Sequence, residues 1–332
     1  MKKVLFATTA LVASAGIAAA EIEFGLSAEM GVFGGDRYED DDLQFHNDFT
    51  ITVDGSGETD NGLAFGLHVE IEESNGADEI NGSASYDNEA VFISGSFGTL
   101  TLGEIDGAFD KRLQETALAA GTIADDETEH AGYNGNGNLD GLYDNQVLRY
   151  DYDFDSFGFS ISAEQANMPQ AYVEDAGAND ADETYAIGFS YDADFGGTAV
   201  GFGLGYQTGT LAFDTDGDLD VDVYEDFDAI GASVHADFGN GFEVAVNYTD
   251  YDFDDAGDGE HIGIGIGYTM DALAIGLNYG EYDSDLGDSE GFGLAVNYDL
   301  GGGAVVQFGY GSSDIDDGDD YESYSLGIAM SF

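Results

Sequence analysis

The chain has no cysteine in 332 residues, one proline, and only six lysine and arginine residues. Without cysteine, no disulfide can hold the fold together. Two of the six basic residues stand at positions 2 and 3, so residues 21–332 carry four basic against 69 acidic residues, a formal net charge of −65. Such a chain cannot neutralise phosphates, which excludes nucleic acid as a partner. Its self-repulsion needs salt or divalent cations for screening, which predicts a saline habitat.

Residues 1–20 have the pattern of a secretory signal peptide. Lys2 and Lys3 precede a largely apolar stretch, and an A-x-A cleavage site lies before Glu21. After residue 20, no apolar run approaches the length of a membrane-spanning helix. Aromatic residues make up 13% of the chain and apolar residues 43%, which argues against disorder. If residues 21–332 meet a membrane, they must do so with strands.

Apolar residues at every second position dominate the rest of the chain. In His261–Tyr268 (HIGIGIGY), isoleucine alternates with glycine. This two-residue period is typical of β-strands with two different faces. The same pattern recurs at 22–32, 49–53, 63–71, 185–191, 200–206, 230–238, 242–248, 273–279, 292–298 and 324–332.

The connections between these segments are alternately short and long. Seven short ones are rich in Gly, Asn or Asp, and eight long ones are acidic, which predicts sixteen strands. A sheet can cross hydrocarbon only if it closes, because every backbone polar group must be paired internally. Short turns at one end, long loops at the other and alternating strands are typical of outer-membrane barrels. The sequence therefore predicts an all-β fold, a 16-stranded antiparallel transmembrane β-barrel over residues 21–332.

In such a barrel the isoleucines would face lipid and the glycines an aqueous lumen. The small lumen residues, Gly263, Gly265, Gly267 and Gly276 among them, are expected to keep that lumen wide. Four tyrosines continue the alternation of the lipid-facing residues and stand next to long loops: Tyr206, Tyr248, Tyr279 and Tyr310. Their positions predict an aromatic girdle at the edge of the membrane. A secreted β-sandwich or solenoid is the alternative. It would need a packed inner face or a fixed repeat, and the sequence has neither.

Specific residues also resemble a known family. The signal MKKVLFATTALVASAGIAAA, the turn Ser56–Gly66 (SGETDNGLAFG), the run Phe92–Gly103 (FISGSFGTLTLG) and the terminal Phe332 are similar to the Rhodobacter- and Paracoccus-like general diffusion porins of alphaproteobacteria. The resemblance implies a homotrimer of barrels in the lipid of a Gram-negative outer membrane, passing ions and small hydrophilic solutes by passive diffusion. It also implies that Phe332 is read by the barrel-insertion machinery.

The same resemblance implies that the third long loop, about 103–145, folds into the barrel and narrows it. Phe109–Ala120 has helical character within it. In the family, acidic residues on this loop face basic residues on the opposite wall. The candidate loop acids are Glu104, Asp106, Asp110, Glu115, Asp125, Asp126, Glu127 and Glu129.

The basic half of this pattern is largely missing. Candidate wall residues are Arg37, His46, Asp48, His68, Glu70 and Arg149, and the loop itself contributes Lys111 and Arg112. Arg149 has lumen parity and is the best candidate for a cation on the wall. Because carboxylates concentrate cations and repel anions, this departure from the family predicts cation selectivity.

Other functions have weaker support. A plugged barrel acting as an adhesin or structural protein would need bulky lumen residues, whereas Gly and Ala dominate. A barrel hydrolase would need a paired His, whereas the five histidines are scattered and no G-x-S-x-G or zinc-ligand spacing accompanies them. The aspartate runs 214–220 and 314–320 lack the EF-hand glycine and helices, so they predict at most weak Ca²⁺ binding. We therefore predict no enzyme activity, no dedicated metal site and no cofactor.

Overall fold

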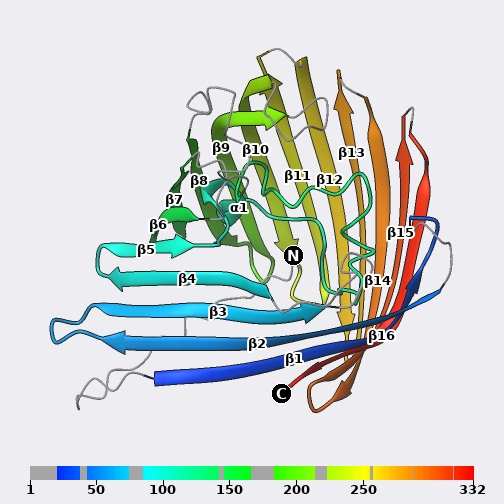
Figure 1. Ribbon diagram of the computed structural model, residues 1–332, viewed down its shortest axis with the longest axis horizontal. Helices are drawn as coiled ribbons and strands as arrows, with labels where there is room; N and C mark the ends of the chain where they lie inside the picture. The colour runs from blue at the N-terminus through cyan, green and yellow to red at the C-terminus, as the bar shows by residue number, and fades with distance from the viewer. Residues whose placement is uncertain are drawn as a thin grey trace.

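The computed structural model describes residues 21–37, 43–74, 85–141, 146–165, 183–213, 223–254, 257–285, 287–316 and 318–332. Sixteen strands lie in these residues, and each pairs antiparallel with its sequence neighbours (Figure 1). The strands are β1 (Glu21–Gly34), β2 (Gln44–Glu58), β3 (Ala64–Ser74), β4 (Ser85–Gly95), β5 (Gly98–Gly103), β6 (Val147–Phe154), β7 (Phe157–Glu164), β8 (Thr184–Asp194), β9 (Ala199–Phe213), β10 (Val223–Asp237), β11 (Phe242–Phe253), β12 (Gly257–Met270), β13 (Leu273–Ser284), β14 (Ser289–Gly301), β15 (Ala304–Ile315) and β16 (Tyr321–Ser331).

The sheet closes on itself where β1 meets β16. Met30 of β1 lies opposite Ile328 of β16 in an antiparallel register. The predicted fold class, a closed 16-stranded antiparallel barrel, is therefore confirmed. The predicted signal peptide at 1–20 and the aspartate run 214–220 lie outside the described residues.

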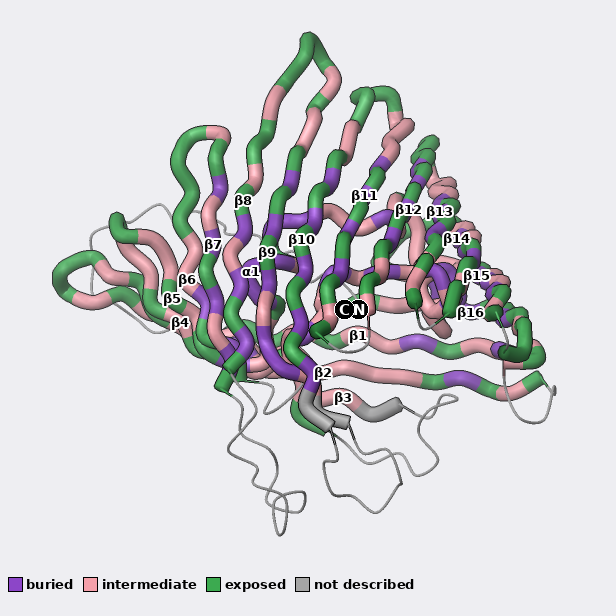
Figure 2. Tube along the Cα trace, turned by 90° about the horizontal axis from the view of Figure 1, so that it is seen from above, coloured by how far each residue is buried: buried purple, intermediate pink, exposed green. Residues whose placement is uncertain are grey.

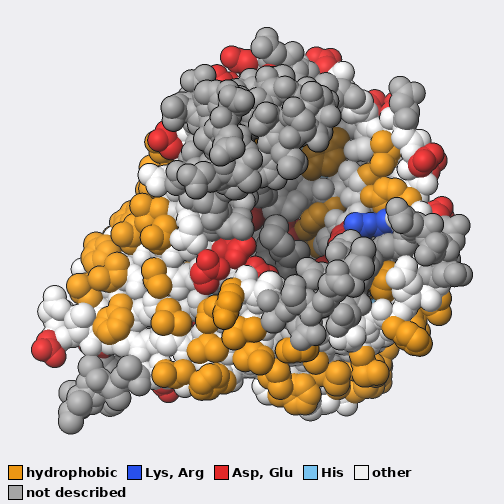
Figure 3. Space-filling model, in the orientation of Figure 1, with side chains coloured by type: hydrophobic (Ala, Val, Ile, Leu, Met, Phe, Trp, Pro, Cys, Tyr) orange, Lys and Arg blue, Asp and Glu red, His pale blue; other side chains and the backbone are white. Residues whose placement is uncertain are grey.

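The alternation of apolar with small or polar residues gives the barrel wall an apolar outer face and a different inner face. Ile262, Ile264 and Ile266 are 42%, 44% and 41% exposed on the outer face, whereas His261 is 1% exposed on the inner one. Figure 2 shows the same exchange of exposed and buried residues along β9 to β12. Hydrophobic side chains gather on the outer surface over β1 to β5 (Figure 3). The outward position of the apolar residues is as predicted.

The tyrosines predicted to form a girdle are on the outer face beside carboxylates. The Tyr206 hydroxyl donates to Asp228 at 2.6 Å, and the Tyr248 hydroxyl donates to Glu260 at 2.7 Å. Both tyrosines lie several residues inside their strands, because β9 continues to Phe213 and β11 to Phe253, so the predicted position directly beside the long loops was wrong. An amphipathic ring with a polar tip suits the place where the apolar band gives way to carboxylates.

The inward loop contains a helix that is shorter than predicted. α1 spans Ala108–Arg112, and Leu113 already has extended backbone angles, φ −90° and ψ 156°. The prediction of helical structure through Ala120 was wrong, because the chain after Arg112 lies extended along the wall. Among the described residues, no helix is long and apolar enough to cross a membrane.

Candidate functional site

The connection between β5 and β6 folds into the barrel and runs along its inner wall (Figure 1). α1 packs against β7, β8 and β9. Ile123 reaches the seam of the barrel, beside Gly31 of β1 and Gly327 of β16. The chain then returns, and the Leu139 N–H donates to Gln207 of β9 at 3.1 Å. The loop is thus a hairpin laid against the wall from β7 round to β1, as the predicted inward loop requires.

Arg112 fastens the start of this loop to the wall. Its side chain is 8% exposed and forms an ion pair with Asp153 at 2.8 Å. It also donates to the Ser160 hydroxyl at 2.7 Å and to the Phe159 carbonyl at 2.9 Å. Every one of these partners belongs to β6 or β7. Arg112 is therefore a buried anchor between loop and wall.

Arg149 performs a similar role beside it. The side chain has the predicted lumen orientation and is 8% exposed. Its Nε pairs with Asp151 at 3.0 Å, and its Nη1 donates to the Asp106 carbonyl of the loop. The guanidinium group is thus hydrogen-bonded to the loop backbone and paired with a carboxylate of the wall. Lys111, by contrast, is exposed on the loop.

Arg37 joins the returning part of the loop to the end of β1. Its guanidinium forms an ion pair with Glu129, and it lies 5.9 Å from the centre of the Tyr321 ring. Three of the four basic residues in 21–332 therefore hold the loop in place: Arg37, Arg112 and Arg149.

The predicted wall residues of β2 and β3 form a second polar group. His68 Nδ1 lies 2.7 Å from Asp54, and its Nε2 lies 3.7 Å from Glu70. His46 Nε2 lies 3.7 Å from Glu29 of β1. Asp48 is half-buried on the same face of β2. Each predicted wall histidine is therefore next to a carboxylate.

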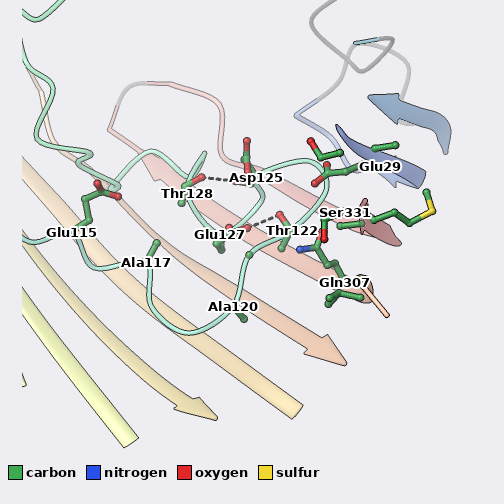
Figure 4. Close-up of a pocket in the computed structure, with 17 residues that line it drawn as sticks. Glu29, Glu115, Ala117, Ala120, Thr122, Asp125, Glu127, Thr128, Gln307 and Ser331 are labelled. Carbon is green, nitrogen blue, oxygen red and sulfur yellow. Dashed lines mark hydrogen bonds between the residues drawn. The ribbon is translucent and has the colours of Figure 1, made fainter. Parts of the chain in front are cut away.

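A cavity of about 440 Å³ lies between the loop tip and the wall of β1, β15 and β16. Figure 4 shows the tip between Glu115 on one side and Glu29 with Gln307 on the other. The cavity lining contains the carboxylates of Glu29, Glu115, Asp125 and Glu127 and no Lys, Arg or His. Glu29 was not among the predicted site residues. It shares the alternating positions of Glu23, Gly25 and Ser27 on β1, and this pattern could have indicated that its side chain faces the lumen.

The remaining loop acids are distributed unevenly. Asp106 is exposed, and Asp110 and Glu129 are half-buried. Asp126 is fully buried beside Gly309 and Gly311 of β15. Burial therefore places Asp126 behind the loop, away from its water-facing edge. Asp and Glu side chains lie at the edge of a central hollow in Figure 3.

Three loop carboxyls have pKa values that are raised to about 7, each mainly by burial. For Glu104, repulsion from Asp87 adds to the effect on the pKa. For Glu127, a hydrogen bond donated by Thr122 partly opposes the rise in pKa. For Asp140, the backbone N–H of Gly107 opposes the rise in pKa. These carboxyls are therefore protonated below neutral pH.

Asp140 also closes the base of the loop. It accepts hydrogen bonds from the Gly107 N–H and from Gln207 Nε2, both at 2.8 Å. Nearby, Glu164 of β7 accepts from the Gly141 N–H at 2.9 Å. These contacts join the two ends of the hairpin to each other and to β7 and β9. Sequence reasoning missed both carboxylates, because nothing local indicates which loop amide each one meets.

The lumen glycines do not simply keep the channel wide. A Cβ on Gly265 would lie less than 3.0 Å from the Thr116 carbonyl, and one on Gly276 would lie less than 3.0 Å from the Leu118 carbonyl. The predicted role of these two glycines was wrong, because the loop backbone fills the space that they leave. The loop, not open water, covers this part of the wall.

The histidines of this region connect loop and wall. His130 Nε2 lies 2.5 Å from the Asn278 amide oxygen, and His261 Nε2 lies 2.9 Å from the Gly132 carbonyl. Over the described ranges, no group of three or more His, Asp or Glu residues is arranged to hold a metal ion.

Comparisons with known proteins agree with this architecture. A family model for Gram-negative porins matches residues 7–318. A porin of Rhodobacter capsulatus is 27% identical over 322 residues, covering 90% of this chain and 96% of that protein. A solved porin structure superposes with a TM-score of 0.68 at 25% identity, covering 94% of this chain and all of the other. A mutant porin of Rh. blastica gives 0.67 at 16% identity, with the same coverage. The chain belongs to the Gram-negative porins and is a general porin channel of the outer membrane, not an enzyme.

Proposed function

We propose that this porin is a cation-selective diffusion channel for ions and small hydrophilic solutes. The observation that carries the proposal is the cavity at the loop tip, which four carboxylates line without a basic side chain. The positions of Arg37, Arg112 and Arg149 support the proposal. The guanidinium groups of these three residues bind carboxylates or carbonyls where the loop meets the wall, so their charges do not offset the carboxylates of the cavity.

The mechanism has two parts and no chemical step. The loop narrows the lumen and sieves solutes by size, because it occupies space along most of the inner wall. The carboxylates that line the cavity make the potential in the lumen negative, which raises the local concentration of cations and lowers that of anions. The effect weakens as salt screens the charges.

The direct test is the zero-current potential of the purified porin in a planar bilayer with a tenfold KCl gradient. A cation-selective pore should give a potential near the potassium limit, about 59 mV per tenfold gradient for a monovalent ion. The potential should fall as the mean salt concentration rises. A potential near zero or of the opposite sign would contradict the proposal. An inserted, folded barrel without conductance would favour the plugged-barrel alternative.

Selectivity should also depend on pH near neutrality. Burial raises the pKa values of Glu104, Glu127 and Asp140 to about 7, so each gains a negative charge as pH rises from 6 to 8. The zero-current potential should therefore move toward the cation limit over this range. Loop docking should weaken between about pH 4.5 and pH 7, because over that window the carboxyls of Glu104 and Glu127 would be ionised in the undocked loop but keep their protons in the docked one.

The control for this pH dependence is Glu127→Gln, which removes one of the three titrating groups. Its potential should change less between pH 6 and pH 8 than that of the unaltered porin. A potential that stays constant from pH 6 to pH 8 in the unaltered porin would contradict the assignment.

The remaining expectations concern assembly and location. We propose export through the signal at 1–20, a homotrimer, and recognition of Phe332 by the insertion machinery. Phe332 is 78% exposed, and its N–H donates to the Leu26 carbonyl of β1 at 2.9 Å, so its ring is accessible at the seam of the barrel. The charge of residues 21–332 supports a saline habitat, since salt screens like charges.

A further inference from the structure

We infer that a track of wall glycines positions the inward loop and thereby sets the width of the channel. The glycine track consists of Gly188, Gly203, Gly265, Gly276, Gly280, Gly293 and Gly311. All seven are buried on the lumen face. At each of them, an added Cβ would lie less than 3.0 Å from a loop carbonyl oxygen, a separation that real Cβ atoms essentially never show. The inference concerns pore width and does not depend on ion selectivity.

The outgoing half of the loop crosses four members of the track. The carbonyls of Ala108 and Arg112 face Gly188 of β8 and Gly203 of β9. Further on, the carbonyls of Thr116 and Leu118 face Gly265 of β12 and Gly276 of β13. The loop thus crosses successive strands with its backbone pressed against theirs.

The returning half crosses the other three. The Asp126 and Glu127 carbonyls face Gly311 of β15 and Gly293 of β14, and the Gly132 carbonyl faces Gly280 of β13. Gly276 and Gly280 are four residues apart on one strand, a distance of about 13 Å at 3.3 Å per residue. The two halves of the hairpin therefore lie side by side, with the returning half nearer the long-loop end of β13.

Space, and not backbone conformation, explains these glycines. None of the seven has a positive φ, so a side chain would be compatible with the backbone angles at each position. Glycine weakens a strand and commonly marks a place where another backbone approaches closely. Both partners here are main chain, so neither can turn aside as a flexible side chain would. An added methyl group must displace the loop or distort the sheet.

A lumen glycine outside the track provides the comparison. A Cβ on Gly25 of β1 would meet only Thr52, with its nearest atom at 3.4 Å, an ordinary van der Waals distance. Gly25→Ala therefore adds the same methyl group to the same face of the barrel without touching the loop.

The experiment compares Gly265→Ala, Gly276→Ala and their double variant with Gly25→Ala. Single-channel conductance and the size limit for neutral polymers report the pore width, and thermal unfolding in detergent reports the stability of the barrel. We expect the double variant to lose about half of its conductance and to admit only smaller polymers, because the displaced loop narrows the constriction. The Gly25→Ala control should match the unaltered porin.

Two further outcomes are also decisive. A raised conductance and a larger size limit in the track variants would mean that the loop has left the wall, and this would equally support a positioning role. Unchanged conductance and size limit in both single variants and the double variant would overturn the inference, even if thermal stability falls. Should the double variant not insert, the two single variants carry the same test.

Discussion

Replacing Arg112 with methionine is expected to free the start of the inward loop and raise the single-channel conductance. Arg112 is buried against Asp153, Ser160 and the Phe159 carbonyl. Asp153 is 70% exposed and stays solvated without its partner, so the cost comes mainly from the lost hydrogen bonds of the buried guanidinium, about 1.5–3 kcal/mol. Methionine fills a similar volume, so the loss is mainly of charge and hydrogen bonds. A loop detached at α1 would leave the lumen wider and more accessible to protease.

Lys111→Met is the matched control for this change. It removes the same charge from the adjacent residue, but Lys111 is exposed. Loop cleavage by an added protease and single-channel conductance should change strongly in Arg112→Met and little in the control. Equal conductance and equal cleavage in the two variants would show that Arg112 does not anchor the loop.

Neutralising three carboxylates of the cavity should remove a large part of the proposed cation selectivity. The triple variant Glu29→Gln, Glu115→Gln and Asp125→Asn keeps side-chain volumes nearly constant and removes three of the four carboxylates in the lining. Because the potential in a narrow, low-dielectric lumen depends most on the nearest charges, we expect the zero-current potential to fall by roughly half. The conductance for potassium at low salt should fall as well, because fewer cations accumulate.

The control variant neutralises as many acids outside the lumen. Asp60, Asp155 and Asp271 are exposed in three short turns. Asp155 and Asp271 have positive φ angles, which asparagine tolerates. Their asparagine variants change the net charge equally and should leave the potential unchanged. Equal reductions in both triple variants would assign the selectivity to the overall charge and not to the cavity.

The strands could be read from the sequence because their signals are local. Alternation such as that of His261–Tyr268 assigns each residue to one face without knowledge of its neighbours across the sheet. The alternation of short and long connections gives the strand number, and the need to pair every backbone group in hydrocarbon gives closure. The position of the inward loop followed from its length and from the family resemblance.

The details of the candidate site were less accessible. The sequence indicated that Arg149 faces the lumen, but not that its guanidinium group donates a hydrogen bond to the Asp106 carbonyl. Asp125 and Asp126 are adjacent in sequence, yet one lines the cavity and the other is buried. Such differences depend on how the loop lies against strands that are up to two hundred residues away.

The sequence by itself determined the barrel, the orientation of its faces and the excess of negative charge, since each depends on periodicity, composition or the pairing of neighbouring strands. Only the tertiary structure decided which carboxylates line the cavity in the lumen and why the lumen glycines are needed. Those properties arise where the loop backbone meets the wall, as Thr116 meets Gly265. Contacts between segments so distant in sequence leave no local pattern, because the same glycine would suit an open lumen or a covered wall.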